Sequence, residues 1–186
     1  VSYTVDVSDA AGNAAVQHSN SFVYDKSASI TGSTFDFGAT LNGTEDDSDA
    51  TLSVTTADVE DGQVVTLNLD GSTYTGTVTS NSASITVPAS ALQALTEGSV
   101  SYTVDVSDAA GNAAVQHSNS FVYDASAPSV VSSAFDFAGS LNGTEDDSDA
   151  TLSVTTADVE DGQVVTLNLD GSTYTGTVTS NSASIT

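Results

Sequence analysis

An internal repeat is the feature that most constrains the fold of this chain. The segment VSYTVDVSDAAGNAAVQHSNSFVYD at 1–25 recurs unchanged at 100–124, which is 99 positions later. The segment 41–86 recurs unchanged at 141–186, which is 100 positions later. A period of about 100 residues is longer than that of the common solenoid repeats and matches the size of one β-sandwich domain. The chain is therefore expected to contain tandem domains of this size.

The position of the variable segment gives the phase of the repeat. SITGST at 29–34 becomes PSVVSSA at 128–134, with a gain of one residue. Linkers and domain starts tolerate such changes best, so the junctions are predicted just after Asp25 and Asp124. Residues 1–25 are predicted to be the C-terminal part of a preceding domain, with its last two strands. Residues 27–124 are predicted to form one complete domain, and residues 127–186 the N-terminal part of a following domain. The two partial domains together lack only the counterpart of 87–99.

Alternating apolar residues and turn signals predict an all-β domain. Val65, Leu67 and Leu69 alternate with polar residues, which is typical of a half-buried strand, and Asp70-Gly71 predicts a hairpin turn. After Pro88, the spacing of two leucines predicts one short helical turn. The predicted strands lie at 30–37, 51–55, 65–69, 73–79, 85–87, 102–106 and 115–123. Seven strands with turns every 8–12 residues predict tandem immunoglobulin-like β-sandwiches in an extended end-to-end array.

The charge of the chain is strongly one-sided. It contains 25 Asp and Glu residues against one Lys or Arg, a formal net charge of −24. Nucleic acid and anionic membrane surfaces are disfavoured as partners because both bind through Lys and Arg. Within 27–124 there are thirteen acids and no Lys or Arg. Salt or bound cations are expected to offset that repulsion.

Strand directions predict that many acids gather at the domain junctions. The loop at 57–63 and the turn at 108–112 are expected at the end of the domain that adjoins the preceding one. Calcium takes 6–8 oxygen ligands, which include carboxylates, carbonyls and water. A calcium site is therefore predicted at this junction from six side chains, Asp25, Asp58, Glu60, Asp61, Asp108 and Asn112. The matching site at the second junction would use Asp124, Asp158, Glu160 and Asp161.

A second type of cation site is predicted at the opposite end of the domain. The polar loop 41–50 carries Glu45, Asp46, Asp47 and Asp49, and the turn at Asp70 is expected nearby. The run from Asp47 to Asp49 lacks the Gly and the distal Glu of an EF-hand loop, which excludes that motif. Ordinary solvated loop acids remain the alternative for any single member of either set.

Three segments carry a resemblance to a known family. SYTVDVSDAAGN…FVYD, VEDGQVVTLNLDGSTYTGTV and VPASALQALTEG together resemble the bacterial immunoglobulin-like extender repeats of giant RTX-type adhesins, which are type I-secreted. The resemblance covers essentially the whole chain. It implies a cell-surface, biofilm-forming or surface-anchoring protein whose repeats are stiffened by calcium at their junctions. It also implies that the six side chains of the first junction are ligands. Lys26 follows Asp25 at the first junction, whereas Ala125 follows Asp124 at the second. This difference implies that the two junctions have unequal affinities for cations.

Sequence alone favours a non-catalytic role. The only histidines, His18 and His117, are copies of one position, and no nucleophile elbow is present. We therefore expect a secreted spacer repeat that projects terminal adhesive domains from the cell. Its partners would be calcium ions and neighbouring repeats, with the split end domains completing each other head to tail. The alternatives are a module that binds carbohydrate or another cell-surface ligand, and an accessory domain of a secreted hydrolase.

Overall fold

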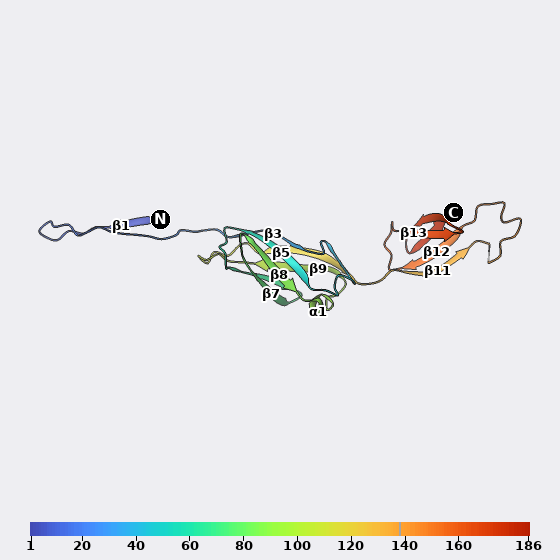
Figure 1. Ribbon diagram of the computed structural model, residues 1–186, viewed down its shortest axis with the longest axis horizontal. Coiled ribbons are helices and arrows are strands. Elements are labelled where there is room, and N and C mark those ends of the chain that lie inside the picture. The colour runs from blue at the N-terminus through green and yellow to red at the C-terminus, as the bar shows by residue number, and fades with distance from the viewer. Residues whose placement is uncertain (138) are drawn as a thin grey trace. The chain divides into compact units, whose positions relative to one another are not determined.

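The computed structural model describes residues 1–137 and 139–186. They divide into two compact units, unit 1 (Val1–Asp124) and unit 2 (Ala125–Thr186). Figure 1 shows that β-strands make up most of the regular structure of both units. Among the described residues, no helix is long and apolar enough to cross a membrane. The division into one complete and two partial domains stays a prediction.

Unit 1 contains two β-sheets. One has three antiparallel strands in the order β3 (Ser29–Phe35), β5 (Ala50–Ala57) and β8 (Ser82–Val87). The other has five strands in the order β4 (Thr40–Asn42), β10 (His117–Asp124), β9 (Gly98–Asp105), β6 (Val64–Leu69) and β7 (Ser72–Thr77). Strand β4 runs parallel to β10, and the remaining pairs are antiparallel. Between the sheets lies the hydrophobic core.

Side chains alternate between this core and the solvent along each strand. On β6, Val65, Leu67 and Leu69 are buried, whereas Val64 is exposed. The same period of two appears on β5 and β8. Each fully buried side chain of this size contributes about 1.5–3 kcal/mol relative to an exposed one. The alternation predicted from the sequence is therefore also the main source of stability.

An aromatic cluster closes the core between β3 and the β9–β10 pair. The Phe35 ring stacks on Phe37 at 4.8 Å and meets Tyr102 and Phe121 edge-on at 5.3 and 5.4 Å between centroids. Offset and edge-on pairs of this kind contribute about 0.5–1.5 kcal/mol beyond their buried area. The last two strands of the domain thus supply half of its aromatic packing.

The predicted all-β sandwich is confirmed, and one segment of the prediction is wrong. Residues 41–50 were predicted as a polar loop throughout, but Thr40–Asn42 forms the extra strand β4. Leu41 is 0% exposed and pairs with Tyr123, which lies in β10. A single apolar residue among polar neighbours shows no period of two. The pairing depends on a strand more than 75 residues away, so local pattern could not reveal it.

Other predicted details appear as expected. The short helix α1 (Ala89–Leu92) begins after Pro88, and its last residue Leu92 and the following Leu95 are buried. At the β6–β7 turn, Asp70 and Gly71 have φ values of 47° and 76°. A type I′ hairpin turn needs positive φ at both central residues, which explains the Asp-Gly pair.

The first 25 residues contain a hairpin that is exposed throughout. Its strands are β1 (Ser2–Val5) and β2 (His18–Ser21), which pair with each other in antiparallel fashion. Every residue of both strands is exposed, including Tyr3 and Val5. The buried core of unit 1 begins at Phe35, so these strands contribute no buried side chain to it.

Unit 2 repeats the first part of the unit 1 fold. It has a three-stranded sheet of β11 (Ser129–Phe135), β12 (Leu152–Ala157) and β15 (Ser182–Ile185). Strands β13 (Val164–Leu169) and β14 (Ser172–Thr177) form a separate two-stranded sheet. Its buried cluster is small and comprises Leu152, Val154, Val178, Ala183 and Ile185.

Candidate functional site

The β5–β6 loop, which carries three of the predicted ligands, is held by backbone contacts. Asp58 has a φ of 56°, a left-handed conformation that is uncommon for residues other than Gly, Asn and Asp. Val59 is buried below it. The Asp61 carboxylate accepts a 2.7 Å hydrogen bond from the Ser80 backbone N–H. The loop is therefore a fixed turn, and it carries Asp58, Glu60 and Asp61.

The β9–β10 turn is organised around one carboxylate. Both oxygens of Asp108 accept hydrogen bonds from Asn112, one from the backbone N–H at 2.7 Å and one from Nδ2 at 2.6 Å. Burial acts to raise the pKa of Asp108, but these hydrogen bonds outweigh it and hold the pKa below its usual value. Gly111 supplies the φ of 90° that the turn requires.

The exposed hairpin contains a second copy of this turn. Asp9 accepts hydrogen bonds from the backbone N–H and the Nδ2 of Asn13, both at 2.8 Å. The side-chain hydrogen bond from Asn13 is the main reason why the pKa of Asp9 is lowered. The turn forms in the hairpin as well as in the packed domain, so it is encoded locally by the Asp-Ala-Ala-Gly-Asn sequence.

The two loops and the linker lie next to one another. Glu60 accepts a 2.8 Å hydrogen bond from the backbone N–H of Ala109, which joins the β5–β6 loop to the β9–β10 turn. The Ser27 hydroxyl lies 3.5 Å from Oδ2 of Asp58, which joins the linker to the same loop. Asp25 accepts a 3.2 Å hydrogen bond from the Ser27 backbone N–H. All six residues predicted for the first junction thus belong to three segments that touch.

These contacts do not assemble a ready coordination sphere. Among the described residues, no three Asp, Glu, His or Cys side chains are grouped closely enough to hold a metal ion. Asp108 already uses both oxygens for Asn112. Asp25, Glu60 and Asp61 each accept a backbone hydrogen bond through one oxygen, which leaves acceptor capacity on an ionised carboxylate. The donor chemistry fits calcium, and the metal role of these residues stays a prediction.

The residues predicted for the second junction fall in both units. Asp124 is the last residue of β10, whereas Asp158, Glu160 and Asp161 lie in the loop between β12 and β13. This loop repeats its counterpart in unit 1, because Asp158 has a φ of 55° and Asp161 accepts a 2.7 Å hydrogen bond from Ser180.

The acids of the 41–50 loop each have a different protein partner. Asp47 accepts a hydrogen bond from Gln93 Nε2, and Asp49 from the Ala89 backbone N–H, both at 3.0 Å. Glu45 accepts a 3.0 Å hydrogen bond from the Asn42 backbone N–H. Asp46 is 5% exposed and binds the Tyr123 hydroxyl at 2.6 Å. Asp46, Asp47 and Asp49 thus fasten the loop to β10 and to the α1 region. Asp70 lies in the β6–β7 turn.

The structural roles of two carboxylates, Asp46 and Asp36, were missed by sequence reasoning. The hydrogen bond from Tyr123 to Asp46, burial, and the charges of Asp46 and Glu97 raise the pKa of Tyr123 to about 12. Asp36 accepts a 3.0 Å hydrogen bond from the Thr51 backbone N–H. Tyr123 and Asp46 are 77 positions apart, so no local sequence pattern indicated their contact.

Comparisons with known proteins place this fold. One similar structure comes from a 1.5-MDa bacterial ice-binding adhesin and concerns its retention on the host cell surface. It is 26% identical to this chain, with a TM-score of 0.50, and the match covers 99% of this chain and 62% of that chain. A calcium-stabilised adhesin that helps an Antarctic bacterium bind ice is 29% identical with a TM-score of 0.42, over 99% of this chain and 47% of that one. This chain therefore spans less than two thirds of either structure.

A single-domain structure gives a further match. An immunoglobulin-like domain of the M. primoryensis ice-binding adhesin is 30% identical, with a TM-score of 0.36, over 50% of this chain and 95% of that domain. Neither a protein-family model nor a curated protein matches the chain. Its two-sheet architecture and its tandem copies define a bacterial immunoglobulin-like β-sandwich repeat. The chain is similar to the immunoglobulin-like repeats of giant bacterial adhesins.

Proposed function

We propose that this chain is a non-catalytic spacer of a secreted bacterial surface adhesin. Its sandwiches would hold the adhesive regions of a longer protein at a distance from the cell. The observation that carries the proposal is the tandem repetition of one sandwich, supported by the match to a large ice-binding adhesin. A sugar-binding role would need an exposed aromatic platform, but the aromatic cluster of Phe35, Tyr102 and Phe121 is buried in the core of unit 1, and exposed rings such as Tyr3 and Phe22 lie in the 1–25 hairpin.

Calcium is the second part of the proposal. Asp25, Asp58, Glu60 and Asp61 would hold the ion where the linker meets the β5–β6 loop. Bound there, calcium would neutralise the loop charge and fasten the linker to the domain. With the linker free to pivot, the repeats would be flexibly joined, and with it fastened they would form a stiffer spacer. The partners in this role are calcium ions and neighbouring repeats of the same protein.

The charge of the chain supports this proposal. With a net charge of −24, the repeats repel one another and themselves at low ionic strength. Extracellular calcium modules commonly bind in the range of about 10⁻⁴ to 10⁻³ M. Binding of that strength would leave the repeats unliganded in a low-calcium cytoplasm and liganded outside the cell. Because the ligands must be ionised, affinity is expected to fall as the pH drops toward the carboxylate pKa values.

Small-angle scattering on the full chain tests the proposal. We expect a larger maximum dimension with calcium than with chelator, and a calorimetric binding signal. The double variant Glu60→Gln and Asp61→Asn should abolish both, because the amides keep an acceptor oxygen for Ala109 and Ser80 but lose the charge.

Asp105→Asn is the matched control, because its carboxylate contacts the Gln116 side chain and lies outside the predicted ligand set. This variant should retain calcium binding and the change in dimension. Identical scattering profiles with calcium and with chelator, for a chain that circular dichroism shows to be folded, would contradict the calcium part of the proposal and leave the spacer role standing.

A further inference from the structure

The path of the chain through the sandwich of unit 1 joins its entry side to its exit strand. The chain enters the sandwich at β3 and leaves it at β10, whose last residue is Asp124. After β3, which pairs with β5 in one sheet, the chain crosses to the other sheet and forms β4 beside β10. The β4–β10 pair is parallel, whereas the neighbouring pairs of both sheets are antiparallel.

Tension applied to the chain on both sides of this sandwich acts along these strands. It draws β3 and β4 back toward their N-terminal ends and draws β10 forward toward its C-terminal end. Because β4 and β10 are parallel, the two strands must then slide past each other. The hydrogen bonds of a parallel pair cross between the strands at even spacing. The tension therefore shears the pair and loads its contacts together rather than one after another.

The β4–β10 pair is short but well anchored. Its register joins three pairs of residues, Thr40 with Val122, Leu41 with Tyr123, and Asn42 with Asp124. The Val122 backbone N–H also donates a 2.9 Å hydrogen bond to the Ala39 carbonyl oxygen. Leu41 is 0% exposed, so sliding of β4 would draw an apolar side chain out of the core into water, which is unfavourable.

Side-chain hydrogen bonds oppose the same movement. The Tyr123 hydroxyl donates a buried 2.6 Å hydrogen bond to Asp46, which lies in the loop after β4. Asn119 of β10 donates from Nδ2 to the Ser33 carbonyl oxygen of β3 at 3.4 Å. Both segments on the entry side are thus attached to the exit strand by side chains as well as by backbone.

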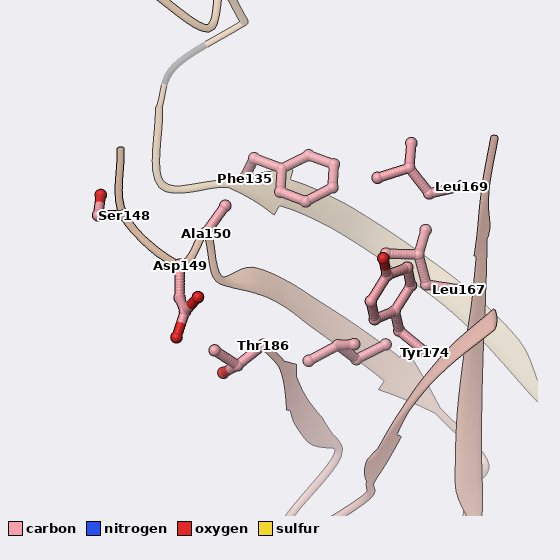
Figure 2. A pocket seen from close by; sticks show the side chains of 9 residues that line it. Phe135, Ser148, Asp149, Ala150, Leu167, Leu169, Tyr174 and Thr186 are labelled. Atoms are coloured by element: carbon pink, nitrogen blue, oxygen red, sulfur yellow. The ribbon is translucent and has the colours of Figure 1, made fainter. Parts of the chain in front are cut away.

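Separation of the last strands would open the core. Unit 2 contains the copy of 41–86 but not that of 100–124, and Figure 2 shows a hollow of about 270 Å³ beside its Phe135, Leu167 and Leu169. In unit 1, β9 pairs with β6 at Leu67 and Leu69, and both leucines are buried. Strand β10 holds β9 in turn. A sandwich that loses the β4–β10 pair under tension therefore loses the closure of its core.

We propose that the parallel β4–β10 pair is a mechanical clamp, which makes the sandwich resist extension along the chain without a bound cation. That the sandwich carries tension rests on the proposed spacer role, because a spacer joined at both ends transmits the load. The clamp itself follows from the strand order and the buried contacts of β4 and β10, and it can be measured whether or not calcium binds.

Single-molecule force spectroscopy on the full chain tests the clamp by changing only the direction of pull. The chain has no Cys, so introduced cysteines give unique handles. Lys26→Cys with Ala125→Cys pulls the sandwich lengthwise. Gly43→Cys with Ala125→Cys pulls apart the adjacent C-terminal ends of β4 and β10, and a side chain at Gly43 meets no atom within 4 Å. Because the three register pairs load together only lengthwise, we expect the unfolding force to be lower by about threefold in the peel.

Two core variants separate mechanical resistance from thermodynamic stability. Leu41→Ala weakens the clamp, whereas Leu67→Ala removes the same side chain from β6, and both leucines are 0% exposed. Both variants should lower the urea midpoint, because each leaves a cavity. Only Leu41→Ala should bring the lengthwise force down toward that of the peel. Tyr123→Phe removes one hydrogen bond without a cavity and should also lower the lengthwise force, so the test holds if Leu41→Ala does not fold.

Both directions are measured in calcium and in chelator. Equal forces in the two directions, or a lengthwise force that the Leu41 and Leu67 variants reduce alike, would overturn the clamp. A lengthwise resistance seen only in calcium would assign it to the ion and would overturn the clamp as well. A lengthwise force that is higher than the peel and unchanged by calcium would support the clamp, and it would count against the calcium part of the proposed function.

Discussion

The hydroxyl of Tyr123 donates a 2.6 Å hydrogen bond to the carboxylate of Asp46, and both residues are buried. Tyr123 belongs to the last strand of the sandwich, and Asp46 belongs to the loop that follows β4. The bond therefore ties the end of the domain to its first loop. In sequence, the two residues are 77 positions apart.

Removal of this hydroxyl is expected to destabilise unit 1. Tyr123→Phe leaves a buried carboxylate without its donor, and the loss of a hydrogen bond to a charged group costs about 1.5–3 kcal/mol. Urea unfolding of wild type and variant measures the difference. Tyr74→Phe, at the edge of the same core, serves as the control and should cost less. Equal midpoints for Tyr123→Phe and wild type would contradict the structural role of this bond.

The same bond predicts a loss of stability at alkaline pH. The pKa of Tyr123 is raised to about 12 in the folded chain, from an ordinary value of 10.0. A raised pKa means that the contribution is fully present below about pH 10 and is lost as the pH rises through about 12. The stability difference between wild type and Tyr123→Phe should therefore shrink across this window. Urea unfolding of both proteins at pH 9 to 12 tests this prediction. A stability difference between wild type and Tyr123→Phe that stays constant over this range would contradict it.

Gly76 is predicted to be intolerant of a side chain. A Cβ at this position would lie 2.5 Å from the Ser84 carbonyl oxygen and 2.9 Å from Cγ1 of Ile85. Since the nearer atom is backbone, β7 and β8 would have to move apart, and overpacking of this kind costs about 1–3 kcal/mol. Thermal unfolding of Gly76→Ala should show this loss. Thr75→Ala, at an exposed position on the same strand, should be nearly neutral.

The Asp108 turn is predicted to matter only where it is packed. Asp108→Ala leaves the part-buried Asn112 N–H and amide donors without their acceptor, so the unfolding temperature of unit 1 should fall. Asp9→Ala removes the same contacts from the exposed hairpin and should leave that temperature unchanged. The lowered pKa of Asp108 has a further consequence. Its contribution is present above the ordinary pKa and is lost as the pH falls through the folded value, so wild type and variant should converge in acid.

Much of the fold could be predicted because the relevant signals are local. The alternation around Leu67, the Asp70-Gly71 turn and the helical turn after Pro88 each depend on a few neighbouring residues. The Asp108–Asn112 turn belongs to this group, because its copy at Asp9 forms in an exposed hairpin. Strand β4 does not, because its pairing is with a strand near the other end of the domain.

The candidate site divides in the same way. Sequence and strand direction were enough to predict that Glu60 would lie near the 108–112 turn, and the hydrogen bond to Ala109 places it there. They could not tell which carboxylates were already committed to protein donors. Asp46 and Asp108 looked like their neighbours in sequence, yet both are buried and hydrogen-bonded. Those bonds involve specific atoms, and only the folded backbone sets their positions.

The sequence by itself determined the repeat, its period and the acid-rich composition of its loops, because these are properties of residue order. Tertiary structure decided the environment of identical residues. Leu69 and Leu169 have the same neighbours in sequence, but one is buried and the other is half exposed. The physical reason is that burial in a sandwich depends on the facing strand, and β9 covers Leu69 whereas β13 has no such partner among the described residues of unit 2.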